Sequence, residues 1–454
     1  MTTKNHGVEM TRPIGIDLFA GAGGLSLGFE QAGFDVVAAV EIDPVHCAVH
    51  KFNFPHCAVL TQSVSSVTGA EIRKAAGLPE DAKVDVVFGG PPCQGFSMIG
   101  QRSLDDPRNR LVYDFVRLVT ELDANYFVFE NVKGLTVGRQ RKFLEEVVEA
   151  FQNAGYEVRL PWKVFNASNY GVPQQRERLI LMGCKQGLNL PDFPAAITRA
   201  ATSAFSSLPP GPTVADAIGD LPDSDLFEEL VNKDTVRNAR YGAPSRYAAE
   251  LRALTNDAWH FGYKRKWDPT VLTSSWRTDH TEISRRRFAE TPSGENEPIS
   301  RFFKLDPIGV SNTLRAGTDG ARGAFTSPRP IHYKYARCIT VREMARLHGF
   351  PDWFRLHSTK WHGARQIGNS VPPPLARAVA ASIMGALGLK PVRPTEVVAL
   401  GDETYLYTTI SEAAELFGVA APRTRRDKNA NIRKRKQHET EAARLAALEA
   451  ASDG

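Results

Sequence analysis

The fold is decided by the stretch Val84-Asp85-Val86-Val87-Phe88-Gly89-Gly90-Pro91-Pro92-Cys93-Gln94-Gly95-Phe96-Ser97. Its first five residues have the length and β-branched content of a buried strand. Proline donates no ladder hydrogen bond and fixes its own φ, so the two prolines end the strand. Cys93 is therefore expected on a stiff turn at the carboxyl end of a strand, where open α/β sheets bind ligands. A lone cysteine is usually inert core packing, but these neighbours favour a reactive one.

The segment around Cys93 resembles the nucleophile motif, Pro-Cys-Gln, of the DNA (cytosine-5) methyltransferases of bacterial restriction–modification systems. Five further motifs, some before and some after Cys93, occur in the same order as in that family and span Ile14 to about Ala380. The resemblance implies an α/β fold: a Rossmann-like S-adenosylmethionine-dependent methyltransferase sheet with a second, smaller and irregular target-recognition domain.

Composition sets the outer limits of the prediction. A chain of 454 residues with 42% hydrophobic and 24% charged residues can hold two or three lobes of a soluble globular protein. The first 13 residues lack the apolar region of a secretory signal, and no apolar run approaches a membrane span. The five cysteines are scattered and odd in number, which predicts a reducing cytoplasm and no disulfide framework.

The net charge of +5 is unevenly distributed. Residues 421–438 carry eight Lys/Arg and one Asp, which leaves the rest of the chain close to neutral. A second basic stretch, 262–337, holds fourteen Lys/Arg against eight Asp/Glu. Basic stretches are more often solvated faces, but this one lies among aromatic and glycine residues and suggests phosphate contacts.

The first strand, predicted over 14–19, runs into the glycine-rich turn 20–24 and a helix over 25–31. Such a turn lets the backbone approach a ligand closely. The glycine spacing is not that of dinucleotide folds, since Ser26 stands three residues after Gly23, and this excludes a nicotinamide oxidoreductase. A second strand over 36–40 ends in Glu41, an acid placed to accept ribose hydroxyls. These features fit an adenosine ligand without a pyrophosphate.

The resemblance names that ligand as S-adenosylmethionine, with S-adenosylhomocysteine as product. It assigns the cofactor to Phe19, Gly21, Gly24, Leu25, Glu41, Ile42, Ser63, Val64, Pro92, Asn369 and Val371. Ser63 departs from the family, which usually has an aspartate there for the adenine amino group. The Gly-Asn-Ser-Val turn 368–371 opens a helix over 373–387, and the family uses it to bring C-terminal residues beside the first strand.

His46, Cys47, His50, His56 and Cys57 could form a zinc site, because two of the histidines stand four residues apart. No second ligand cluster accompanies them. We expect packing and surface positions, and no metal.

Glu130-Asn131-Val132 follows the apolar run 126–129 and matches the second catalytic motif of the family. Alternation places Gln174, Arg176 and Arg178 on one face of an extended segment. The resemblance makes Cys93, Glu130, Arg176 and Arg178 catalytic. It assigns DNA contacts to Ser97, Arg102, Gln174, Thr313 and Arg315.

The regular rhythm of strands and helices breaks down between about 191 and 330, the expected target-recognition domain. The predicted organisation is catalytic domain 12–190, recognition domain 191–330, return to the catalytic domain 331–392, and a C-terminal extension 393–454. Arginine reads guanine well in the major groove, so runs such as Arg285-Arg286-Arg287 lean toward a G·C-rich site. Within the extension, 409–419 resembles the first half of a helix-turn-helix, and 423–436 is a basic run suited to phosphate.

The implied chemistry is methyl transfer to carbon 5 of a cytosine. Thiolate addition at carbon 6 makes carbon 5 nucleophilic, with Glu130 as the acid at N3 and Arg178 near O2. The base must leave the duplex to be reached. Expected partners are double-stranded DNA and a cognate restriction endonuclease acting separately, with the enzyme a monomer that binds no membrane. The alternatives are an RNA cytosine-5 methyltransferase and a catalytically silent DNA-binding relative.

Overall fold

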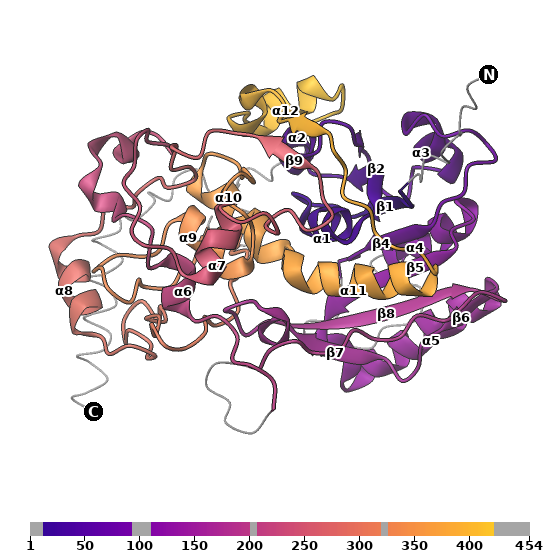
Figure 1. Cartoon of the computed structure of the whole chain (residues 1–454), viewed down its shortest axis with the longest axis horizontal. Helices are drawn as coiled ribbons and strands as arrows, with labels where there is room; N and C mark the ends of the chain where they lie inside the picture. The colour runs from indigo at the N-terminus through magenta and orange to yellow at the C-terminus, as the bar shows by residue number, and fades with distance from the viewer. Residues whose placement is uncertain (1–11, 93–109, 200–206, 319–325, 422–454) are drawn as a thin grey trace, which may run out of the picture.

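The computed structural model describes residues 12–92, 110–199, 207–318 and 326–421 (Figure 1). Its centre is an eight-stranded sheet in which five parallel strands, in the order β3-β2-β1-β4-β5, are followed by β8, which runs in the opposite direction; β6 and β7 each pair antiparallel with β8. The strands are β1 (Ile14–Leu18), β2 (Asp35–Glu41), β3 (Ala58–Thr61), β4 (Val86–Gly89), β5 (Tyr126–Val132), β6 (Tyr156–Val158), β7 (Lys163–Asn166) and β8 (Glu177–Lys185). This confirms the predicted Rossmann-like α/β fold.

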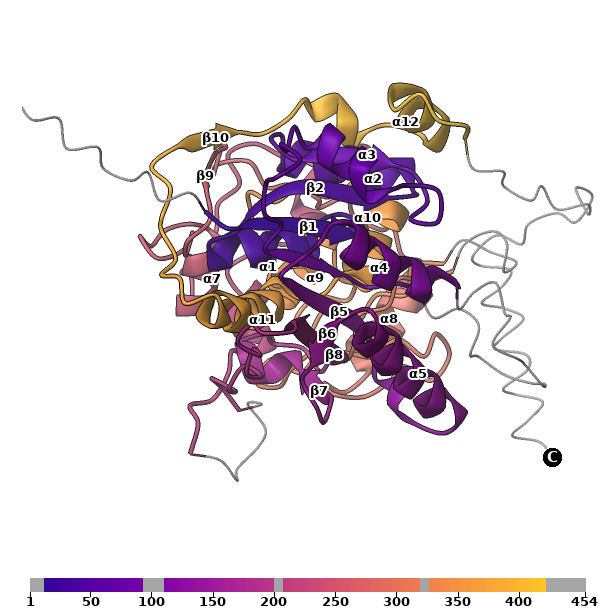
Figure 2. The ribbon, with the colours of Figure 1, turned by 90° about the vertical axis from the view of Figure 1, so that its right-hand side faces the viewer.

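Helices cover both faces of the sheet, so the alternate residues of each strand, which point to opposite sides, are buried on both faces. Val86 and Phe88 of β4 pack on the side of α1 (Gly24–Ala32) and α11 (Pro373–Ala386). Val87 packs on the other side, against α4 (Arg110–Glu121) and α5 (Arg139–Asn153). Figure 2 shows these helix pairs on opposite sides of the strands.

Every residue of α1 is buried, since the helix is enclosed between the sheet and α11. A side chain at Gly28 would bring its Cβ within 2.3 Å of Cβ of Ala376. The C-terminal helix α11 thus lies against the helix that follows the first strand. The remaining helices of this lobe, α2 (Pro44–Asn53) and α3 (Gly69–Ala75), begin at the side-chain caps Asp43 and Thr68.

The described part of 191–330 is irregular, as predicted. It contains the short elements α6 (Val214–Ile218), α7 (Arg246–Leu251), β9 (Lys264–Lys266) and α8 (Glu282–Glu290). The chain then forms α9 (Val341–His348) and α10 (Lys360–Asn369). The predicted burial of Met344, Ala345 and Leu347 is confirmed, since none is exposed.

The core of this second lobe is shared between segments that were predicted to belong to different domains. Val214 and Ala217 of α6 lie in the same apolar cluster as Met344 and Leu347 of α9. Residues on both sides of position 330 thus share one hydrophobic core. The proposed domain limits stay predictions.

The arginine run of α8 is already paired within the lobe. Arg285 contacts Asp225 at 2.7 Å, Arg286 contacts Glu290 at 2.9 Å and Arg287 contacts Glu297 at 3.1 Å. Counting arginines in this region therefore overstates the guanidinium groups free to read DNA. The arginine run of α8 therefore no longer supports the prediction of a G·C-rich recognition site.

The C-terminal extension continues with β10 (Val397–Ala399), which pairs in parallel with β9, and α12 (Ile410–Leu416). Ala413 and Ala414 of α12 are buried, and the helix packs on α2. The basic run 423–436 lies outside the described residues, as does any second half of a helix-turn-helix. Among the described residues, no helix is both long and apolar enough to span a bilayer.

Candidate active site

The turn between β1 and α1 is built for close approach by a ligand. Gly21 and Gly23 have φ of 55° and 99°, values that favour glycine. A Cβ at Gly23 would lie 2.5 Å from the Phe54 ring, whereas nothing lies within 4 Å of one at Gly21. The turn is thus packed tightly on its inner side and open at Gly21. Phe19 precedes it, also with a positive φ, of 62°.

The residues predicted to hold adenosine lie at the carboxyl ends of neighbouring parallel strands. Glu41 ends β2, and its carboxylate accepts hydrogen bonds from the amides of Gly21 (2.9 Å) and Asp43 (2.8 Å). The next side chain, Ile42, is 65% exposed. Beyond β3, the Ser63 hydroxyl accepts from the amide of Ser65 at 3.2 Å, and Val64 is buried.

The C-terminal part of the predicted cofactor site also reaches this turn. A Cβ on Gly24 would lie 2.7 Å from the carbonyl oxygen of Val371, so backbone meets backbone here. Val371 and Leu25 are buried, and Asn369, the last residue of α10, is exposed. An open glycine turn, an anchored carboxylate, an exposed apolar side chain and an exposed amide together suit an adenosine with an amino-acid tail.

Three buried polar residues behind the turn were not found from the sequence. The hydroxyl of Ser26 donates to Asp17 Oδ2 at 2.6 Å and lies 3.0 Å from Nε2 of His50. Burial raises the pKa of Asp17 to about 8 and lowers the pKa of His50 to about 3. Both are therefore mainly uncharged near neutral pH, and they tie β1, α1 and α2 together without burying a net charge. Their separation in sequence hid the cluster.

The second part of the site lies where β4 and β5 end. Glu130 is buried and forms an ion pair with Arg178, whose Nε lies 2.7 Å from Oε1. Burial raises the pKa of Glu130, although Arg178 and Arg176 oppose the change. A Cβ on Gly90 would lie 2.5 Å from Oε2 of Glu130, so this carboxylate rests against the backbone of the strand end.

Asn131 connects the same two strand ends, because its side-chain amide donates to the carbonyl of Pro91 at 3.1 Å. The described chain continues to Pro92. Three predicted site residues, Cys93, Ser97 and Arg102, lie outside the described residues.

Gln174 and Arg176 are fully buried. The amide of Gln174 reaches the carbonyl of Leu347 (3.3 Å) and Nδ1 of His348 (3.0 Å), and its oxygen accepts from the amide of Leu314 (3.1 Å). The guanidinium of Arg176 donates to three carbonyls, those of Leu314 (3.0 Å), Gly368 (2.7 Å) and Ser370 (2.8 Å). The structure thus places Gln174, predicted to contact DNA, and Arg176, predicted to be catalytic, in hydrogen bonds within the protein, and both roles stay predictions.

The two buried side chains hold the end of the recognition region against the catalytic lobe. Between them lies Leu314, flanked by the exposed residues Thr313 and Arg315. The hydroxyl of Thr313 donates to the carbonyl of Gln175 at 2.5 Å. On the other side, a Cβ at Gly368 would lie 2.2 Å from the amide nitrogen of Ala316. Thr313 and Arg315 are thus presented to solvent on either side of the buried Leu314.

The histidines and cysteines of the possible zinc site lie in and beside α2, and most of them are buried there. His46, Cys47, His50 and Cys57 are buried, and His56 is exposed. Within the described ranges, no group of three or more His, Cys, Asp or Glu side chains is arranged to hold a metal ion.

Comparison with known proteins agrees with this geometry. The family model described as C-5 cytosine-specific DNA methylase matches residues 14–385. The type II methyltransferase M.XorII of Xanthomonas oryzae pv. oryzae is 60% identical over 412 residues, 91% of this chain and 94% of the relative. M1.HphI of Haemophilus parahaemolyticus, also a type II methyltransferase, is 33% identical and covers 81% of this chain and 86% of its own.

A solved structure is also similar, that of a prophage-encoded protein of E. coli described as a DNA modification methyltransferase. Its TM-score is 0.66 at 33% identity, covering 83% of this chain and 99% of that one. The fold and the site thus define a Rossmann-like methyltransferase. More specifically, the chain belongs to the C-5 cytosine-specific DNA methylases and is a DNA (cytosine-5) methyltransferase of the bacterial restriction–modification type.

Proposed function

We propose that this enzyme methylates carbon 5 of a cytosine flipped out of a specific double-stranded DNA sequence, with S-adenosylmethionine as donor and Cys93 as covalent nucleophile. The observation that carries the proposal is the contact between the two strand ends. The carboxylate of Glu130, paired with Arg178, lies against the Gly90 backbone only three residues before Cys93. An acid and a nucleophile carried on adjacent strand ends can act on one base.

We assign the cofactor to the edge formed by the glycine turn, Glu41, Ile42 and Val371. When bound there, S-adenosylmethionine would supply an electrophilic methyl group. Glu41 is suited to ribose hydroxyls, since each of its oxygens accepts one backbone amide and keeps a further lone pair. Ile42 offers an exposed apolar surface for the adenine.

The residues of the chain prepare the ring for methylation. The Cys93 thiolate forms a bond to carbon 6, and the electrons of the C5–C6 double bond move onto carbon 5 and toward N3. Glu130, whose pKa is raised by burial, donates a hydrogen bond or proton at N3, and Arg178 balances charge at O2. After carbon 5 takes the methyl group, a water molecule accepts its proton. The electron pair of that C–H bond re-forms the C5–C6 double bond, the sulfur leaves as the Cys93 thiolate, and N3 returns any proton to Glu130.

Gln174 and Arg176 are proposed as positioning residues instead of ligands. They fix Leu314, so that Thr313 and Arg315 meet the DNA backbone beside the flipped base. The same bonds join the recognition region to the turn that bears Asn369.

The similarity to type II methyltransferases leads us to propose that the enzyme protects host DNA against a separate restriction endonuclease. It would do so as a monomer in the cytoplasm. Bisulfite sequencing of plasmid from cells that express the chain would identify the protected sequence.

The test of the mechanism is Cys93→Ser, which should abolish methylation and leave DNA and cofactor binding largely intact, because a hydroxyl is a far weaker nucleophile here. An oligonucleotide with 5-fluorocytosine at the target should become covalently linked to the wild type and not to the variant. Cys57→Ser serves as the matched control, since Cys57 is buried beside α2. Normal turnover by Cys93→Ser would refute the assignment.

A further inference from the structure

We propose that residues 392–416, here called the C-terminal strap, belong to the cofactor site, and that Leu406 positions the glycine turn through Ala22. The strap lies beyond residue 385, where the match to the family model ends. This inference rests on the proposed cofactor site and extends it to a part of the chain that the family motifs do not include.

The strap is fixed to the end of α2 by backbone contact. The amide of Gly401 donates to the carbonyl of Phe52 at 2.8 Å. A Cβ at Gly401 would lie 2.9 Å from Cα of Phe52, an approach that only glycine permits. Since backbone atoms on both sides make this contact, the strap has little freedom to shift along the helix.

The next turn of the strap, η6 (Glu403–Leu406), inserts Leu406 behind the cofactor turn. Leu406 is completely buried in a small apolar cluster with Ala22, Val49 and Phe52. Ala22 lies between Gly21 and Gly23, the two glycines with positive φ. Leu406 therefore belongs to the same buried cluster as the residue between the two glycines of the turn.

The strap also contacts the chain that leads to the other side of the cofactor site. The carbonyl of Leu406 accepts from the amide of Ser358 at 2.9 Å, and the carbonyl of Thr408 lies 2.9 Å from Nε2 of His357. Both partners directly precede α10, which ends at Asn369. One segment thus supports both the glycine turn and the helix that carries Asn369.

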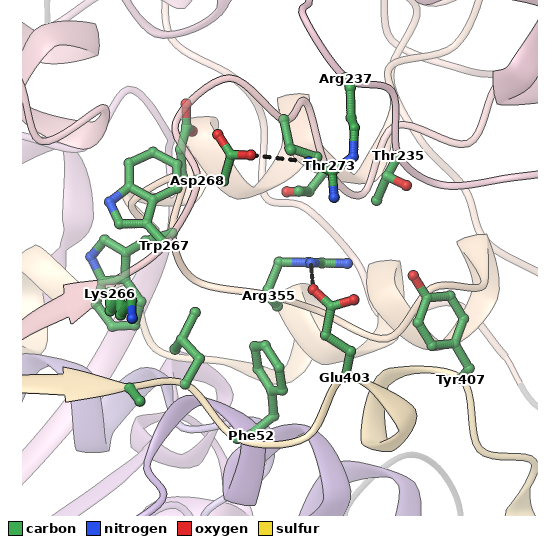
Figure 3. Close-up of a pocket in the computed structure, with 16 residues that line it drawn as sticks. Phe52, Thr235, Arg237, Lys266, Trp267, Asp268, Thr273, Arg355, Glu403 and Tyr407 are labelled. Carbon is green, nitrogen blue, oxygen red and sulfur yellow. Dashed lines mark hydrogen bonds and ion pairs between the residues drawn. The ribbon is translucent and has the colours of Figure 1, made fainter.

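On its other side the strap faces a cavity of about 500 Å³ and not a packed core. Figure 3 shows this space between Phe52, Trp267, Arg355 and Tyr407. Across it, Glu403 approaches Arg355 only to 3.7 Å. β10 of the strap pairs with β9, but near Leu406 the ion pair across the cavity is long, whereas Leu406 itself is completely buried in the cluster with α2, so trimming Leu406 should loosen the turn first.

The test is Leu406→Ala in the full-length enzyme, with Leu416→Ala as matched control. Leu416 lies on the same strap but is 47% exposed. Leu406→Ala should raise the Kd for S-adenosylmethionine, measured by calorimetry, and its KM about tenfold, since the lost leucine leaves a cavity in the cluster that contains Ala22. kcat at saturating cofactor and the Kd for DNA should change by less than about twofold. Leu406→Met, which keeps the volume, should restore the affinity.

Leu406→Val provides a milder variant if Leu406→Ala does not fold, and it should raise the Kd by a smaller factor. Wild-type affinity in folded Leu406→Ala or Leu406→Val would overturn the inference. So would an equal loss in Leu416→Ala, or a loss confined to kcat. Failure of the wild type itself to bind S-adenosylmethionine would instead contradict the proposed function.

Discussion

At Gly90 the backbone passes so close to Glu130 that a single methyl group tests their arrangement. Gly90→Ala would place Cβ 2.5 Å from Oε2, so the carboxylate must move. We expect kcat to fall about 100-fold, the scale of one general acid, while the KM for S-adenosylmethionine changes little. Gly134→Ala is the control, because its Cβ would meet its nearest neighbour at 3.6 Å. Single-turnover methylation measures both, and equal rates would show that Glu130 is not required where it lies.

A second prediction at this scale concerns the ribose. Glu41→Ala should weaken S-adenosylmethionine binding by about 2–3 kcal/mol, the scale of hydrogen bonds to a charged group. Ser63→Ala should cost less, because its hydroxyl already caps a local turn. Glu80→Ala, at an exposed position, controls for the loss of one negative charge. Calorimetric titration in which Glu41→Ala binds like the wild type would place the ribose elsewhere.

At the scale of a single element, α9 shows how buried charge holds the second lobe. Glu343 accepts two hydrogen bonds from Arg337, at 2.9 and 2.8 Å, and completes the N-terminal capping box with Thr340. Burial by itself would raise the pKa of Glu343, but Arg337 and His332 lower it to about 2. Arg337 also contacts Asp223, which ties the start of α9 to the recognition region.

The pH dependence of this pair can be predicted with its sign. A carboxyl group with a lowered folded pKa contributes stability above its unfolded pKa, about 4.5, and loses it as the pH falls toward 2. Glu343→Gln should therefore lower the free energy of unfolding at pH 7, with a gap to wild type that narrows between about pH 4.5 and 2. Glu290→Gln, in the exposed pair with Arg286, should cost little at any pH. A constant gap in urea titrations across this range would contradict the prediction.

For the whole molecule, we predict that affinity and sequence choice reside in different parts. Residues 421–438 carry eight Lys/Arg, and phosphate contacts add affinity without sequence information. Deleting residues 422–454, which leaves the strap intact, should weaken binding to all DNA alike and flatten its salt dependence, since fewer counterions are released. The methylated sequence should not change.

The complementary experiment exchanges residues 191–330 for the corresponding segment of M1.HphI. This exchange should change the sequence that is methylated, because base contacts are expected in that region. Deep bisulfite mapping of both variants distinguishes the two parts. A new site after the tail deletion would make the tail a reader and refute the proposed division.

The features that depend on near neighbours could be predicted from the amino-acid sequence. Prolines after Phe88 end β4, alternating apolar residues define β4 and β5, and glycines with positive φ form the turn after β1. The order of these local signals was enough to predict the sheet, the irregular region after 190 and the family. Strand ends and turns can be predicted in this way because the residues that cause them lie within a few positions of them.

The hydrogen-bond partners of the buried polar groups became known only from the tertiary structure. Arg176 was predicted to be a catalytic residue, whereas in the structure its hydrogen-bond partners are carbonyls 138, 192 and 194 residues away. The partners of Arg285 and of Leu406 are likewise far along the chain. A side chain such as that of Arg176 can donate hydrogen bonds either to a ligand or to carbonyl groups of the protein. When it is buried it bonds within the protein, because a buried donor needs a partner. Burial follows from the packing of distant segments, which no local pattern in the sequence expresses.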